Sequence, residues 1–204
     1  RSIAGLQKIP KGKIFLKGKL LSSEIDHIEP EKRNVALSFQ DNSLFPHYTI
    51  EKNINIALER KNSSKKKINP NEVIKILGIN KILNKYPHQV SAGEAQRVSL
   101  ARSLSSNPDL LLLDEPLSNI DTSFKEEIQV ELKQILNRFK ITTIIVTHDS
   151  YEAFYLGDKC GVILDNKLEQ FDTPYNLYHF PNSIKIVKFL NRGVLIPAIV
   201  TSPK

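Results

Sequence analysis

The sequence predicts an α/β fold with a mostly parallel core sheet flanked by helices. Residues 110–113 are four leucines that end abruptly in Asp114-Glu115-Pro116. Such a short, wholly apolar run is typical of a strand buried on both faces, as in parallel sheets. Residues 142–146 are rich in β-branched side chains and predict the next buried strand. Between these runs, residues 124–139 repeat apolar side chains at helical spacing, which predicts a helix with one buried face.

The composition indicates a globular protein with one full domain and room for part of another. The 204 residues are 40% hydrophobic and 25% charged, and no apolar run is long enough to span a bilayer. Lys+Arg 29 against Asp+Glu 22 gives a net charge of +7, but the lysines are scattered and their one cluster lies in a polar stretch, residues 65–67. We therefore expect no nucleic-acid partner. The single Cys160 lies in an apolar run and fits a core position in a reducing cytoplasm.

Two carboxylates follow the leucine run directly. Asp114 and Glu115 would lie at the carboxyl end of a strand, where ligands of open α/β sheets bind. A carboxylate there can hold Mg²⁺, usually through water, and a second one can orient and deprotonate an attacking water. An acid pair at the start of a helix would look the same, so the pair alone leaves both interpretations open.

The helical run before this strand begins with Ser91-Ala92-Gly93-Glu94. Ser91 can cap the helix, and Gly93 allows the backbone to come close to a ligand. The free N–H groups and the positive end of the helix dipole suit phosphate. An ordinary capped helix explains these residues as well.

Residues 90–121, VSAGEAQRVSLARSLSSNPDLLLLDEPLSNID, resemble the signature motif, Walker B strand and D-loop of ATP-binding-cassette (ABC) ATPases. The resemblance is specific and extends over nearly the whole chain. It implies a P-loop NTPase-type core with an antiparallel β edge, forming an ABC ATPase domain over residues 1–190. A helical subdomain would be inserted at about residues 50–105. Residues 191–204 would be a linker and the start of a truncated C-terminal β regulatory domain.

The phosphate-cradling GxxxxGK[ST] loop of this family does not occur in the sequence, and the chain contains no Met. In the family that loop leads into a helix ending in a phrase similar to residues 1–6. We therefore interpret the sequence as a fragment without the Walker A region, and we expect the fragment alone not to hydrolyse ATP. Residues 13–16 and 19–21 predict a small β-hairpin, which resembles the adenine-side edge of the family.

The resemblance also implies roles for single residues. Asp114 would hold Mg²⁺, Glu115 would be the general base, and His148, in TIIVTHDSYEA, would be the switch histidine that senses the γ-phosphate. Gln40, in RNVALSFQ, matches the Q-loop and would contact Mg²⁺ and the attacking water. Without the resemblance, a glutamine after a strand is a loop amide, and a histidine at a strand end is usually structural.

Two copies of the chain would stack head to tail, with Asp121 of the D-loop crossing the interface. The nucleotide of one copy would meet the signature of the other, residues Ser91, Ala92, Gly93 and Glu94. The family signature usually has glycine at position 92. If the backbone there requires a positive φ, alanine costs about 1 kcal/mol, and we expect weakened closure.

Several further elements can be placed from capping residues and turns. Thr49 can cap a helix, and Asn69-Pro70 is a good start for another. Asp165-Asn166 lies between two apolar runs and predicts a hairpin turn. The helices are expected at residues 50–59, 70–77, 81–84, 94–105, 150–156 and 182–190, and Thr173-Pro174 opens another helical stretch.

The sequence therefore predicts the ATP-hydrolysing subunit of an ABC importer, peripheral on the cytoplasmic face of the plasma (inner) membrane. Its cofactors would be ATP and Mg²⁺. Its partners would be transmembrane permease subunits, a second ATPase subunit and, indirectly, a periplasmic or extracellular binding protein. Residues 189–198, FLNRGVLIPA, most resemble iron(III)-type members.

The alternative is a soluble ABC-type ATPase acting in DNA repair or translation. DNA-handling relatives insert long coiled coils or zinc modules between the Q-loop and the signature. Here the stretch from Gln40 to Ser91 has no heptads and no cysteine pairs. A purely structural partner would not need Asp114, Glu115 and His148.

Overall fold

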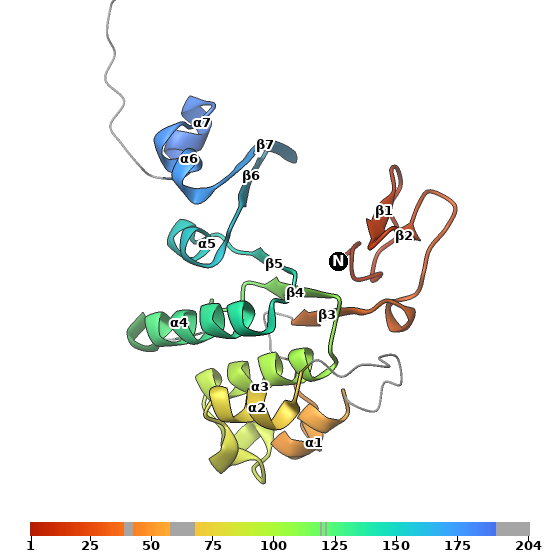
Figure 1. The fold of residues 1–204 in the computed structure, drawn as a ribbon, viewed down its shortest axis with the longest axis vertical. Helices are drawn as coiled ribbons and strands as arrows, with labels where there is room; N and C mark the ends of the chain where they lie inside the picture. Colours follow the sequence, from red (N-terminus) through yellow and green to blue (C-terminus); the bar gives the residue numbers. More distant parts are fainter. Residues whose placement is uncertain (39–42, 58–67, 119, 121, 191–204) are drawn as a thin grey trace, which may run out of the picture. The chain divides into compact units, whose positions relative to one another are not determined.

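The computed structural model describes residues 1–38, 43–57, 68–118, 120 and 122–190, and the side chains of residues 122–124 are not described. The chain divides into two compact units, Arg1–His148 and Asp149–Lys204, which we describe one at a time (Figure 1). The domain limits expected from the resemblance stay a prediction. The strand expected within residues 194–200 lies outside the described residues.

A three-stranded parallel sheet forms the centre of the first unit, in the order β3-β4-β5 (Figure 1). β3 is Val35–Ser38, β4 is Leu110–Asp114 and β5 is Thr143–Val146. The four leucines of β4 are buried, as expected of a central strand covered on both faces. The parallel sheet, its helices and its antiparallel hairpins confirm the predicted α/β fold class.

The expectation that β5 is a buried strand is wrong. Ile144 is 41% exposed and Val146 is 58% exposed, while the alternate residues Thr143 and Ile145 are half-buried. Among the described strands β5 pairs only with β4, so it lies at an edge of this sheet and one of its faces meets solvent. β-Branched residues favour an extended backbone, but they carry no information about what covers the second face.

The helices of the first unit form two groups. The long helix α4, Thr122–Phe139, buries Ile128, Leu132 and Ile135 on one face, which confirms the predicted amphipathic helix. The other helices pack on one another, α1 and α2 against α3 and α2 also against α4. These are α1 (Ile50–Asn55), α2 (Pro70–Ile76) and α3 (Ala92–Ser105), with short 3₁₀ turns η1 (Pro30–Lys32), η2 (Asn80–Ile82) and η3 (Pro87–Gln89).

The helix starts are those that the capping residues predict. Thr49 accepts a hydrogen bond from the backbone of Lys52 at the start of α1. Asn69 accepts one from Asn71 at the start of α2, where Pro70 takes the first helical position. These caps satisfy backbone N–H groups that have no partner inside the helix, so local sequence fixes where each helix begins.

A buried arginine links the N-terminal hairpin to the first residues of the chain. β1 (Ile14–Leu16) pairs antiparallel with β2 (Lys19–Ser22), as predicted. Arg33 is 4% exposed, and its guanidinium donates hydrogen bonds to five oxygens, those of Ser2, Ile3, Leu21, Ile28 and the Ser22 hydroxyl. Burial lowers the pKa of Arg33 from its usual value. All five N–H donors are used, so one side chain links the first residues of the chain to the hairpin.

The second unit is a hairpin with three short helices. The strands β6 (Cys160–Leu164) and β7 (Lys167–Asp172) pair antiparallel, with Asp165 and Asn166 at φ of 50° and 61° in the turn between them. This is the turn that the sequence predicts. The helices are α5 (Ser150–Leu156), α6 (Pro174–His179) and α7 (Ile184–Phe189), and the core consists of Val162, Leu177, Ile186 and Leu190.

Cys160 packs against this core and is half-buried, and its thiol donates to the carbonyl oxygen of Ala153 at 3.2 Å. It thus lies at the edge of the core and not at the buried position that the apolar run predicts. Within the ranges that the structure describes, no helix is both long and apolar enough to cross a membrane.

Candidate active site

The carboxyl ends of β4 and β5 bring a carboxylate and an imidazole together. Asp114, the last residue of β4, stands in register with Val146 of β5, and the backbone N–H of Glu115 donates to the Val146 carbonyl at 2.8 Å. Nδ1 of His148 then lies 3.2 Å from Oε1 of Glu115. Because parallel strands end at the same edge, two residues far apart in sequence meet there. Both residues are among those to which the family resemblance gives a role.

The backbone of Glu115 has an unusual conformation. Its φ is 47°, in the left-handed region that residues other than glycine rarely adopt. Its carbonyl accepts hydrogen bonds from the N–H of Ser118 at 3.2 Å and from the Ser118 hydroxyl at 2.9 Å. Such a conformation costs about 1–2 kcal/mol and tends to occur at functional sites. The sequence analysis missed it, although Pro116 gives a hint, since a residue before proline avoids the right-handed helical region.

This edge of the sheet is open to a ligand. The side chain of His148 is 76% exposed and that of Glu115 is 29% exposed, while Asp114 is half-buried. A carboxylate that is partly covered and oriented by a neighbour can act on a water molecule that enters from solvent. The geometry thus provides a candidate base, Glu115, and a candidate donor to a bound anion, His148.

The start of α3 is a complete capping box. The N–H of Glu94 donates to the Ser91 hydroxyl at 3.2 Å, and the N–H of Ser91 donates to the Glu94 carboxylate at 2.8 Å. Ala92 is the first helical residue and is not among the residues with positive φ. The strain considered for alanine at this position is therefore absent. A Cβ added to Gly93 would meet only Ile128 Cδ1, at an ordinary 3.6 Å.

Of the remaining predicted site residues, those that the structure describes are not brought into this geometry. Gln40 and Asp121 lie outside the described residues. Ser91 and Glu94 make the hydrogen bonds above with each other and not with the β4 edge. The structure therefore places the predicted site in two parts, the β4–β5 edge and the start of α3.

The carboxylates at the β4 edge suit a Mg²⁺ ion that is also held by nucleotide phosphates better than a Mg²⁺ ion held by the protein alone. Among the residues that the structure describes, no group of three or more His, Cys, Asp or Glu side chains is placed to hold a metal ion. Mg²⁺ usually keeps several waters and takes one or two carboxylates together with the phosphates of a substrate. Asp114 and Glu115 supply that number of carboxylates.

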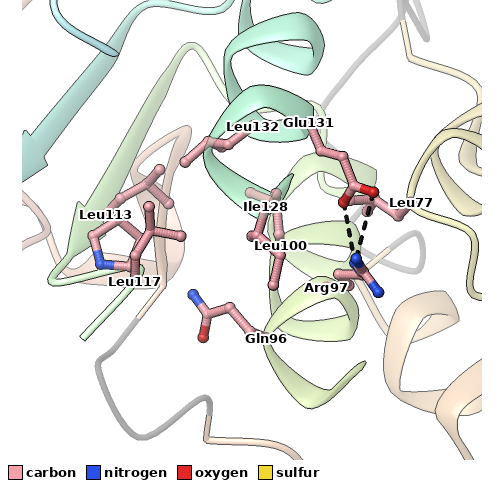
Figure 2. Close-up of a pocket in the computed structure, with 10 residues that line it drawn as sticks. Leu77, Gln96, Arg97, Leu100, Leu113, Leu117, Ile128, Glu131 and Leu132 are labelled. Atoms are coloured by element: carbon pink, nitrogen blue, oxygen red, sulfur yellow. Dashed lines mark hydrogen bonds and ion pairs between the residues drawn. The ribbon is translucent and has the colours of Figure 1, made fainter. Parts of the chain in front are cut away.

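A small, mostly apolar pocket lies between α3, α4 and the end of β4, and neither Glu115 nor His148 is among its lining residues. Figure 2 shows leucines of the β4 side facing α4, with Arg97 and Glu131 on the opposite side. The pocket belongs to the packing of the two helices and does not hold the predicted catalytic groups. Its lining residues are Leu77, Gln96, Arg97, Leu100, Leu113, Pro116, Leu117, Ile128, Glu131 and Leu132.

Comparison with known proteins shows the family of this chain. Residues 1–118, more than half of the chain, match the family model described as ABC transporter. The chain belongs to the ABC transporter family. The match covers α3 and the β4 carboxylates, so both parts of the predicted site up to residue 118 lie inside it.

Two relatives have names that refer to import. The chain is 36% identical over 200 residues to the "Fe(3+) ions import ATP-binding protein FbpC 2" of Haemophilus influenzae, covering 97% of this chain and 56% of that protein. It is 38% identical over 194 residues to the "Spermidine/putrescine import ATP-binding protein PotA" of Chromobacterium violaceum, covering 94% and 53%. The ABC chain thus spans about half the length of the curated relatives it matches.

A solved structure shares the fold. It is an ATP-binding cassette described as a dimer in a post-hydrolysis state bound to ADP and Pi, with a TM-score of 0.68 and 23% identity. The likeness covers 84% of this chain and 77% of that one. At this identity the likeness concerns the fold, and it supports a cassette-type α/β architecture.

Proposed function

We propose that this chain is the nucleotide-binding part of an ATP-hydrolysing subunit that powers import through an ABC transporter. The observation that carries the proposal is the contact between Glu115 and His148 at the shared end of β4 and β5. The family match and the names of the two relatives support it, and they favour an importer over a soluble ATPase of DNA repair or translation.

The proposed chemistry is the hydrolysis of ATP by an activated water. Glu115 accepts the proton of the water, Asp114 holds Mg²⁺, and His148 donates a hydrogen bond to the γ-phosphate. Bound Mg²⁺ supplies charge neutralisation for the transferring phosphoryl group. Gln40 completes the site in this proposal through Mg²⁺ and the attacking water.

The His148–Glu115 contact gives the carboxylate a defined direction before a ligand arrives. A side chain held by one neighbour loses less conformational freedom when it must face a water molecule. Because Glu115 is only partly exposed, its charge is less screened than a fully solvated one and acts more strongly on the water. Both effects are properties of this chain's own residues.

The second part of the proposal concerns assembly. Two subunits stack head to tail, so that Ser91, Ala92, Gly93 and Glu94 of one subunit meet the nucleotide of the other, with Asp121 at the interface. The partners are transmembrane permease subunits and, through them, an external binding protein. The subunit works on the cytoplasmic face of the membrane. Iron(III) is the cargo to test first, because the relative from Haemophilus influenzae is named for it.

Glu115→Gln in the full-length protein tests the catalytic assignment. The amide keeps the size of the side chain but cannot accept the proton, and loss of a general base costs about 10²- to 10⁴-fold in rate. We expect ATP to trap the variant as a dimer, measured by size-exclusion chromatography with light scattering, while phosphate release falls by that factor. ATP binding is expected to persist because Asp114 is unchanged.

Two results would contradict the proposal. One is a Glu115→Gln protein that hydrolyses ATP at the normal rate, and the other is a variant that stays monomeric at saturating ATP. Ser118→Ala is the matched control, because it removes a hydrogen bond to the backbone carbonyl of Glu115 and leaves the carboxylate itself in place. That control is expected to retain phosphate release within about threefold, since a neutral hydrogen bond contributes about 1 kcal/mol or less.

A further inference from the structure

We propose that Arg97 is a positioning residue whose ion pair with Glu131 fixes the start of α3 on α4. Through that contact Arg97 sets how residues 91–94 meet the nucleotide of the second subunit. The inference rests on the proposed function, because it assumes that this helix start acts across a dimer. Arg97 would touch neither nucleotide nor water in this role, and it would act through the helix that carries the signature.

The ion pair is two-pronged and mostly shielded from solvent. Nε of Arg97 donates to Oε2 of Glu131 at 3.1 Å, and Nη2 donates to Oε1 at 3.4 Å. The side chains are 22% and 25% exposed. A second carboxylate, Glu127, lies 3.6 Å from the same guanidinium but is 61% exposed. Figure 2 shows Arg97 of α3 and Glu131 of α4 facing each other across the rim of the pocket.

The pair lies one helical turn beyond the signature. Gly93 and Arg97 are four residues apart and therefore on the same face of α3. At Gly93, α3 faces Ile128 of α4 at an ordinary packing distance, since an added Cβ would be 3.6 Å from Ile128 Cδ1. α3 therefore faces α4 at two successive turns, and the ion pair at Arg97 is the directional contact of the two. That ion pair restricts the rotation and sliding of the helix start on α4.

The apolar packing between α3 and α4 does not fix the orientation of α3 in the way that the ion pair does. The neighbouring pocket is lined chiefly by apolar side chains, among them Leu100, Leu113, Leu117 and Leu132. Apolar contacts are non-directional, so by themselves they favour burial without specifying one orientation of α3 on α4. A bidentate guanidinium–carboxylate pair is directional, so it selects one of the arrangements that the leucines allow.

The helix that receives the pair is the next element after the catalytic strand. β4 ends in Asp114, and α4 follows it along the chain and carries Glu131. Within one subunit, the Arg97–Glu131 pair therefore joins α3 to α4. α3 begins with the signature that would meet the partner's nucleotide, and α4 is the helix that follows the subunit's own Asp114 and Glu115.

The experiment measures ATP-driven dimerisation of the full-length protein carrying Glu115→Gln. Into that background we would introduce Glu131→Gln, Arg97→Lys, Arg97→Glu and the swap Arg97→Glu with Glu131→Arg. We expect Glu131→Gln and Arg97→Lys to raise the ATP concentration for half-maximal dimerisation about three- to tenfold, and Arg97→Glu to raise it further. On a logarithmic scale, the swap is expected to reverse at least half of the increase in that ATP concentration that Arg97→Glu alone causes. Arg97→Lys keeps the charge and most of the aliphatic stem, so it also tests whether the fork itself matters.

Glu72→Gln is the matched control. Glu72 of α2 pairs with Arg138 of α4, so this change also removes a carboxylate that joins α4 to its neighbouring helices, but away from the signature. It is expected to leave ATP-driven dimerisation unchanged. Binding of ATP to the single subunit and the melting temperature without nucleotide are recorded for every variant, which separates loss of positioning from loss of folding.

The outcomes separate this inference from the proposed function. If the Glu115→Gln background itself fails to dimerise with ATP, both are overturned. If it dimerises normally, but Glu131→Gln and Arg97→Lys change nothing, only the positioning role is overturned. The same holds if Glu72→Gln shifts dimerisation as much as Glu131→Gln does, or if the swap recovers nothing while its melting temperature is normal. A dimerisation defect confined to the Arg97–Glu131 variants and recovered by the swap supports the inference.

Discussion

The start of α3 and the end of β4 carry the two parts of the candidate site, and they are built in opposite ways. At α3, Ser91 and Glu94 satisfy each other's backbone N–H groups, and Ser91 has an ordinary extended backbone. At β4, Glu115 has a φ of 47°, and both its backbone N–H and its side chain contact residues of the next strand and loop. The first region is self-contained, and the second depends on β5.

This difference separates stability from chemistry. A helix cap that satisfies its own backbone stabilises the fold whatever it later binds. A residue in a rare backbone conformation destabilises the fold locally, and it persists only where neighbours hold it. In this ABC chain the capped helix start is therefore the stabilising part, and the strained strand end is the part that the proposed reaction would use.

The largest effect is expected from His148→Ala in the full-length protein. We expect phosphate release to fall by about 10²-fold or more, because a donor to developing phosphate charge is lost, while ATP-driven dimerisation persists. Since 76% of the His148 side chain is exposed, the free energy of unfolding is expected to change little. Steady-state phosphate release and chemical unfolding would be measured together. Normal turnover would show that His148 is structural and would leave Glu115 as the reactive residue at this edge.

A medium effect tests the strain at the strand end. Glu115→Gly is expected to raise the free energy of unfolding by up to about 1 kcal/mol, because glycine adopts positive φ without steric cost. Glu115→Gln is the control, since it removes the charge but keeps the strained backbone, and it is expected to give no such gain. Urea unfolding of the full-length protein measures both. A glycine variant less stable than the glutamine variant would show that the contacts of the side chain outweigh the strain.

The opposite sign is expected at the helix start. Ser91→Ala is expected to lower the free energy of unfolding by about 1 kcal/mol, because the N–H of Glu94 loses its acceptor. Ser91→Arg in the Glu115→Gln background is expected, in addition, to block ATP-driven dimerisation while one subunit still binds ATP. If the arginine variant loses stability but dimerises fully, Ser91 is a cap and nothing more. That result would remove the start of α3 from the site.

The smallest effect is expected from Ala92→Gly. Because Ala92 is already helical, glycine relieves no strain, and its greater backbone freedom is expected to cost about 0.5 kcal/mol of unfolding free energy or less. ATP-driven dimerisation is expected to stay within about twofold of the parent. Clearly tighter dimerisation would show instead that the methyl group of Ala92 obstructs the second subunit.

Local patterns in the sequence determined the elements, while the family resemblance singled out the site residues. The leucine run gave a buried central strand, Thr49 and Ser91 gave helix starts, and Asp165-Asn166 gave a hairpin turn. Each of these depends on groups within a few residues of one another, such as a hydroxyl and an N–H three positions away. The convergence of Glu115 and His148 could also be expected, because parallel strands end at one edge.

The tertiary structure decided what depends on contacts between distant segments. Local patterns could not predict three features. These are the exposure of β5, the backbone conformation of Glu115, and the carboxylate that pairs with Arg97. The Glu115–His148 contact joins residues 33 positions apart, and the Arg97–Glu131 pair joins residues 34 positions apart. The sequence lists such groups without their distances, and only the packing of α3, α4 and the sheet brings particular pairs within hydrogen-bond reach.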